Sequence, residues 1–145
     1  MLDDLLTLLA GTAGFDLEVV SRAKGDEAEV RAIGIALGEI LGDALTRPRA
    51  AGIADAAAPA DEALAHVTVE ASGQARLVTN VDLTAAHVGG LRSDLLAEFL
   101  EALVEGAGLT LHVRLLHGVE TQHVLDAIVK ALALALARAC APRGS

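Results

Sequence analysis

The feature that most constrains the fold is an internal repeat of helix, glycine break and strand. Residues 99–113 (FLEALVEGAGLTLHV) resemble residues 5–19 (LLTLLAGTAGFDLEV). In both copies a helical pattern ends at glycines, and alternating strand residues and a second helix follow. A repeated helix–strand–helix unit indicates duplication. We therefore expect a single α+β domain over residues 1–145, with pseudo-repeats at 1–45 and 60–140 and helices packed on β-sheets.

Hydrophobic periodicity and turn residues predict the remaining elements. Helical periodicity is found in four segments, residues 2–9, 26–45, 94–105 and 121–138. Strand alternation is found in four others, residues 15–20, 65–70, 77–81 and 109–115. Residues 46–59 are rich in Ala, Pro and Gly and are predicted to form a loop. Ser72 and Gly73 are predicted to join two of the strands as a hairpin.

The composition excludes several classes of protein. The chain is 53% hydrophobic and 1% aromatic, with a formal net charge of −9 and a single cysteine, Cys140. Nucleic-acid binding favours basic surfaces or stacking rings, and a disulfide scaffold needs paired cysteines. The most apolar segment, residues 124–141, carries Asp126, Lys130 and Arg138, which a membrane span would avoid. We therefore expect a cytoplasmic protein with no nucleic-acid or membrane partner.

Five segments stand in an informative order along the chain. They begin at residues 34, 59, 87, 109 and 121 and read GIALGEILGDAL, PADEALAHVTVEASGQ, HVGGLRSDLLAEFLEAL, LTLHVRLLHG and TQHVLDAIVKALALAL. Together they resemble the imidazoleglycerol-phosphate dehydratase family of histidine biosynthesis. The resemblance implies duplicated α+β half-domains with helices between two four-stranded sheets, and trimers that assemble into a larger shell. It also implies two manganese ions between subunits and the removal of water from imidazole glycerol phosphate.

The positions that would bind metal in such a family are largely replaced. The family's chemistry depends on two His-His-x-x-Glu helix starts and on further single histidines. No histidine precedes His66, so the first motif has no counterpart, and the second reads Gln122-His123-Val124-Leu125-Asp126. His112 matches the family's strand histidine. The resemblance thus implies His112, His123 and Asp126 as residual metal ligands in a shortened, degenerate member whose first half lacks its N-terminal strands.

The family's phosphate site is reduced in the same way. Its Arg-Arg-Phe-Gly is replaced around residues 52–55, and its Ser-Gly-Arg reads Ser72-Gly73-Gln74. Lys130 matches the family's helix lysine, and Glu62 lies in its Asp-Glu-Ala-Leu, which makes these two the residual substrate-binding candidates. Each lost arginine removes a charge-assisted contact worth roughly 1.5–3 kcal/mol.

The residual candidates also have structural explanations. His112 fits a surface histidine on the polar side of its strand. Asp126 suits the positive end of a helix dipole, and with Lys130 it forms an i, i+4 pair in the favourable order.

Three functions remain open from the sequence. The leading hypothesis is a dehydratase-like protein that has lost metal-dependent catalysis, has no catalytic residue or cofactor, and serves as an oligomeric assembly or binding protein. Replacements cluster on the metal-ligand positions, while the core positions are kept, and this pattern favours the first hypothesis. The second is an active manganese-dependent dehydratase completed by a partner subunit, such as a full-length dehydratase. The third is a site for one Mn²⁺ or Zn²⁺ ion built from His112, His123 and Asp126. A short first half would leave sheet edges uncovered, so we expect a homo-oligomer, with a trimer favoured.

Overall fold

The computed structural model describes residues 27–81, 87–88 and 91–142. Its helices are α2 (Glu27–Leu45), α3 (Ser93–Ala107) and α4 (Thr121–Cys140). Its strands are β1 (Ile53–Ala60), β2 (Ala63–Glu70), β3 (Arg76–Thr79), β4 (His87–Val88), β5 (Leu91–Arg92) and β6 (Thr110–His117). The predicted α+β class is confirmed. The predicted helix over residues 2–9 and strand over 15–20, and with them residues 5–19 of the repeat, lie outside the described residues.

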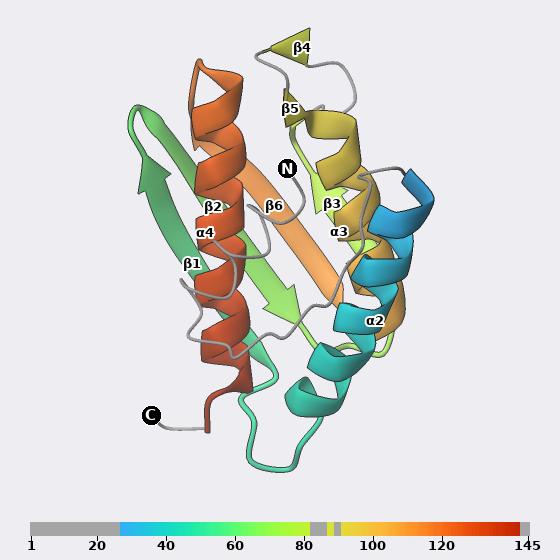
Figure 1. Ribbon diagram of the computed structural model, residues 1–145. Helices are drawn as coiled ribbons and strands as arrows, with labels where there is room; N and C mark the ends of the chain where they lie inside the picture. Colours follow the sequence, from blue (N-terminus) through green and yellow to red (C-terminus); the bar gives the residue numbers. More distant parts are fainter. Residues whose placement is uncertain (1–26, 82–86, 89–90, 143–145) are drawn as a thin grey trace.

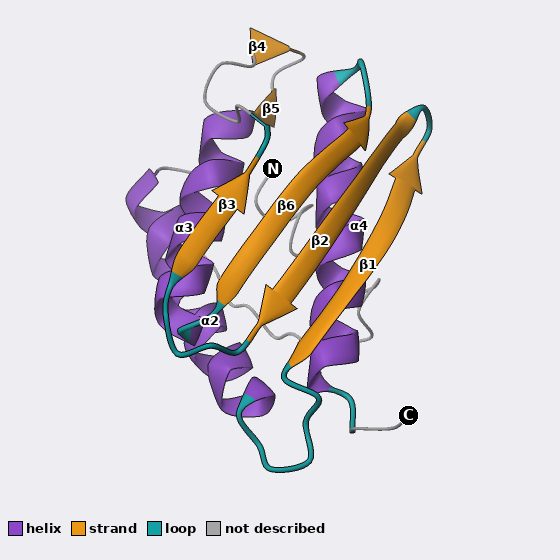
Figure 2. Ribbon diagram, turned by 180° about the vertical axis from the view of Figure 1, so that it is seen from behind, coloured by secondary structure: helices purple, strands orange, loops and turns teal. Residues whose placement is uncertain are grey.

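The described helices cover one face of a four-stranded sheet (Figures 1 and 2). The strand order is β1-β2-β6-β3; β2 runs antiparallel to β1 and β6, and β3 runs parallel to β6. Strand residues alternate between the helix side and the open side, as the pleat requires. β4 and β5 form a separate two-stranded pair.

The core is aliphatic and is centred on α4. This helix packs against β1 and β2, and α3 lies over β3. The largest fully buried side chains of α4 are Leu125, Ile128, Leu132 and Leu136. They meet small or β-branched residues on the strands, among them Ala58, Ala65 and Val67. Small strand residues let the helix lie close to the sheet. Among the described helices, none is long and apolar enough to cross a membrane.

Helices α2 and α3 approach each other along a row of glycines. Gly34, Gly38 and Gly42 recur every fourth residue of α2 and face α3. A β-carbon built on Gly34 would lie 2.7 Å from Ala102 Cβ, and one on Gly42 would lie 2.8 Å from the Ala107 carbonyl oxygen. Only glycine allows backbone contact this close. These glycines therefore fix the spacing of the helix pair.

The predicted loop over residues 46–59 is wrong in its second half, which belongs to the edge strand β1. Ala56, Ala58 and Ala60 point into the core, while the residues between them are exposed. Alanine has little β-propensity, so the alternation was hidden in the sequence. Pro59 is tolerated there because an edge strand can leave one side of its backbone unpaired.

The predicted hairpin joined at Ser72 and Gly73 is also wrong. β2 pairs with β1 through a short turn at Asp61 and Glu62, and β6 lies between β2 and β3. The segment after β2 instead crosses the end of β6, where Gly73 N–H donates to the Gly108 carbonyl at 2.8 Å. This places β6 between two partners, where its backbone is paired on both sides.

Candidate functional site

Two connections meet at one end of the sheet. The turn between β1 and β2 and the start of α4 lie side by side in both views (Figures 1 and 2). The turn carries Asp61, which has a positive φ of 53°, and Glu62. Glu120 is the N-cap residue of α4, and His123 follows in the first turn of the helix. Acidic and imidazole side chains are thus brought together from distant parts of the chain.

The His123 ring lies among three carboxylates. Its Nδ1 is 2.6 Å from Glu62 Oε1 and 3.3 Å from Glu120 Oε2, and its Nε2 is 3.4 Å from Asp61 Oδ2. The histidine side chain is 28% exposed, whereas Asp61 is 76% exposed. Glu62 therefore makes the closest and least hydrated contact with the ring.

The contact between His123 and Glu62 shifts the ionisation of both groups. The hydrogen bond to Glu62 is the largest cause that raises the pKa of His123, with partial desolvation opposing it and the charges of Glu120, Glu62 and Asp61 adding to it. The same hydrogen bond is the largest cause that lowers the pKa of Glu62, and backbone N–H groups of Glu120 and Val119 lower it further. The contact therefore favours the imidazolium form of His123 and the carboxylate form of Glu62.

Asp126 has a different partner from the one expected. Gln122 Nε2 donates to Asp126 Oδ1 at 3.0 Å, one turn along the helix. Among the ion pairs of the described residues, none joins Asp126 to Lys130, which is half-buried on α4. The helix dipole acts mainly within the first turn of α4, and Asp126 lies beyond that turn. The expected pairing of Asp126 with Lys130 is therefore wrong.

His112 lies on the opposite face of the sheet from the helices. It alternates along β6 with buried Leu111 and Val113, and its cross-strand neighbours are Thr68 and Val78. Within the described part of the chain, the structure does not bring His112 to His123 and Asp126. A common metal site for these three residues stays a prediction. It would need residues from more than one copy of the chain.

Sequence reasoning missed Asp61 and Glu120 as neighbours of His123. Glu120 had a readable signal, because it lies three residues before His123 and such residues are adjacent at a helix start. No such signal indicated that Asp61 and Glu62 lie close to His123, because their position depends on β1 being a strand.

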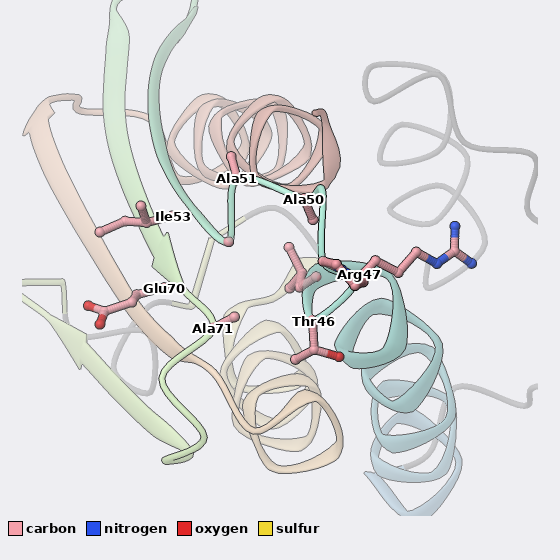
Figure 3. Close-up of a pocket in the computed structure, with 10 residues that line it drawn as sticks. Thr46, Arg47, Ala50, Ala51, Ile53, Glu70 and Ala71 are labelled. Atoms are coloured by element: carbon pink, nitrogen blue, oxygen red, sulfur yellow. The ribbon is translucent and has the colours of Figure 1, made fainter. Parts of the chain in front are cut away.

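The connection from α2 to β1 and the end of β2 lie at the other end of the sheet (Figure 1). A pocket of about 420 Å³ is found there (Figure 3). Its lining consists of Leu45, Thr46, Arg47, Pro48, Ala50, Ala51, Gly52, Ile53, Glu70 and Ala71. Figure 3 shows Arg47 and Glu70 pointing away from each other, with alanines between them. The lining includes residues 52 and 53, which replace the family's arginine segment. One arginine opposed by one glutamate offers no concentrated positive charge for a phosphate.

Comparison with known proteins gives a consistent result. The sequence profile described as "Imidazoleglycerol-phosphate dehydratase" matches residues 1–136. The chain belongs to the imidazoleglycerol-phosphate dehydratase family. It is 40% identical to the imidazoleglycerol-phosphate dehydratase of Desulforudis audaxviator (strain MP104C) over 99% of this chain and 76% of that protein. The crystal structure of the dehydratase from Staphylococcus aureus superposes with a TM-score of 0.86 at 33% identity, covering 97% of this chain and 82% of that one. The structure from Pyrococcus furiosus, in complex with (S)-C348, gives 0.79 at 30% identity, with 99% and 80% covered.

The manganese ions that the dehydratase resemblance implies can be tested against the donors of this chain. Among the described residues, one group offers three donor atoms within 4.8 Å of one another, and it consists of Glu62, Glu120 and His123. Three donors from one imidazole and two carboxylates fit a single divalent ion. Two six-coordinate manganese ions need a larger donor set. Within one copy of the described residues, this donor set therefore fits one metal ion.

Proposed function

We propose that this member of the dehydratase family does not dehydrate imidazole glycerol phosphate by itself and serves as a non-catalytic assembly or binding subunit. The observation that carries the proposal is the 3.0 Å hydrogen bond from Gln122 Nε2 to Asp126 Oδ1. These residues occupy the first and last positions of the family's second His-His-x-x-Glu motif. An amide replaces an imidazole there and occupies the carboxylate that would serve as its fellow ligand.

The remaining histidines support the same conclusion. His123 is engaged with carboxylates, and His112 faces the open side of the sheet. A Lewis acid in such a reaction supplies several kcal/mol of transition-state stabilisation, so the loss of most of its ligands removes the main source of rate.

Substrate binding is expected to be weak as well. Lys130 is the one family-matched cation, while Gln74 stands in place of an arginine. Glu62, the second residual candidate, is engaged by His123 through a 2.6 Å contact. A lysine acts as a point charge and lacks the bidentate geometry that arginine offers to phosphate.

Retention of the framework supports a use other than catalysis. The glycine row of α2, the buried face of α4 and the alternation of β2 are all consistent with the fold. Consistency of this kind across packing and pattern is expected for a chain selected to fold.

The experiment is an assay of the purified chain with Mn²⁺ and imidazole glycerol phosphate, alongside the dehydratase from Staphylococcus aureus as a positive control. We expect no turnover above background from the chain alone. A mixture of the two proteins tests completion by a partner subunit, and we expect the rate of the full-length enzyme alone. Turnover by the chain alone that disappears in His123→Ala would overturn the proposal.

A further inference from the structure

We propose that Glu62, Glu120 and His123 form a binding site for one divalent transition-metal ion, with Zn²⁺ as the best fit. The site differs from the His112, His123 and Asp126 set, because its two carboxylates come from the β1–β2 turn and from the N-cap of α4. It does not depend on whether the chain has lost catalysis.

The first step of the argument is convergence of donors. One ligand atom from each of the three residues lies within 4.8 Å of the other two. Zn²⁺ binds imidazole nitrogen and carboxylate oxygen at about 2.0–2.2 Å, which places tetrahedral donors roughly 3.4 Å apart. The observed spacing therefore needs only small side-chain rotations. The shortest contact, 2.6 Å between His123 Nδ1 and Glu62 Oε1, opens when the ion replaces the proton between them.

The second step is charge. Asp61, Glu62 and Glu120 carry three negative charges around one imidazole ring. A divalent ion bound among them would offset two of these charges, with Asp61 at the rim of the site. The cluster thus has an excess of negative charge that suits a divalent cation.

The third step is the framework that holds the donors. Gly118, in the connection before α4, packs so closely that a β-carbon there would lie 2.7 Å from Val124 Cγ2 and 3.2 Å from Ala63 Cβ. Ala63 directly follows Glu62, so this contact keeps the loop that carries Glu120 against the turn that carries Glu62. Backbone N–H groups of Val119 and Glu120 are directed to the Glu62 carboxylate. Such supporting contacts orient ligands in metal sites.

The donor chemistry selects the ion. One imidazole and two carboxylates, with a position left for water, match an open zinc site. For such a nitrogen and oxygen set, Zn²⁺ binds more tightly than Mn²⁺ in the usual order of divalent ions.

The test is calorimetric titration of the full chain with Zn²⁺ after treatment with a chelator. We expect one equivalent bound by the parent. Glu62→Gln and Glu120→Gln keep the side-chain size and remove a ligand charge, and we expect each to weaken binding by about tenfold or more. Asp126→Asn and His112→Gln are the matched controls, and we expect both to bind as the parent does.

Circular dichroism of each variant shows whether it is folded, and either glutamate variant alone is sufficient for the test. Absence of Zn²⁺ binding by the parent overturns the proposal. Equal affinity of the parent and the folded glutamate variants does so too, as does a loss of binding confined to Asp126→Asn or His112→Gln. Activity is not part of this measurement, so its outcome is separate from that of the dehydration assay.

Discussion

His123 Nδ1 and Glu62 Oε1 lie 2.6 Å apart although 61 residues separate them in the sequence. The contact joins the start of α4 to the β1–β2 turn and raises the pKa of His123, which favours its charged form. Its contribution to stability has a defined sign. Because the pKa of His123 is raised on folding, the stabilisation is complete below the unfolded pKa and is lost as the pH rises through the folded pKa.

The first prediction is that NMR titration gives His123 a pKa above the ordinary value of about 6.5. Glu62→Gln is expected to lower it, because the largest cause of the shift is removed. Glu101→Gln, an exposed change on α3, is expected to leave the pKa of His123 unchanged. A histidine that titrates below the ordinary value, or one that is insensitive to Glu62→Gln, would contradict the geometry.

A second prediction concerns the glycine row of α2. In Gly38→Ala the new methyl group meets the Leu103 carbonyl oxygen, so the helices must separate. We expect a loss of about 1–3 kcal/mol in the free energy of unfolding, measured in urea, despite alanine's better helix propensity. Ala36→Ser, on the exposed side of the same helix, is the control and should change stability by less than about 0.5 kcal/mol. Unchanged stability in Gly38→Ala would mean that the helix pair tolerates a wider spacing.

The third prediction concerns the ion pairs between α2 and α3. Arg31 contacts Glu98 Oε2 at 3.3 Å and Glu105 Oε2 at 3.0 Å, with its side chain 37% exposed. We expect Arg31→Gln to be mildly destabilising at low salt and neutral at high salt, because exposed pairs are screened. Urea unfolding at two salt concentrations measures this. A salt-independent loss would assign the role of Arg31 to packing of its aliphatic stem instead.

The fourth prediction is a homo-oligomer, with a trimer favoured. Four large hydrophobic side chains are exposed on the described part of the chain, namely Ile40, Ile53, Leu116 and Val119. Light scattering of the purified chain at micromolar concentration gives the mass directly. A monomer mass under these conditions would rule the assembly out. Retention of the oligomer after chelation would show that assembly does not require metal.

The sequence predicted α2, α3, α4 and β6 to within a few residues, because each has a strong period and a clear stop. Helix α4, for example, was expected over 121–138 and is found at Thr121–Cys140. β1 was missed because its inward residues are alanines, which do not mark a strand. The neighbour of β3 was misjudged because strand pairing depends on which strand occupies the centre of the sheet, and local turn residues do not determine that.

The candidate site was predictable only in part. His123 was found through the family motif, and Glu62 through the family's Asp-Glu-Ala-Leu, but nothing in the sequence placed them together. Their contact requires β1 and β2 to pair so that the turn reaches the start of α4. Asp126 was expected to join His123 because it lies three residues away, yet its carboxylate accepts a hydrogen bond from Gln122 instead.

The central position of β6 has a consequence for how the molecule opens. β6 pairs with β2 on one side and with β3 on the other, so the β1–β2–α4 part and the β3–α3–α2 part share this strand. Successive amide groups of β6 bond alternately to β2 and to β3, so complete exposure of β6 requires both ladders to break, whereas exposure of the edge strand β1 requires only one. Hydrogen exchange should therefore be slower along β6 than along β1. Because β6 links the two parts, neither part could separate from the other unless one of the two β6 ladders breaks.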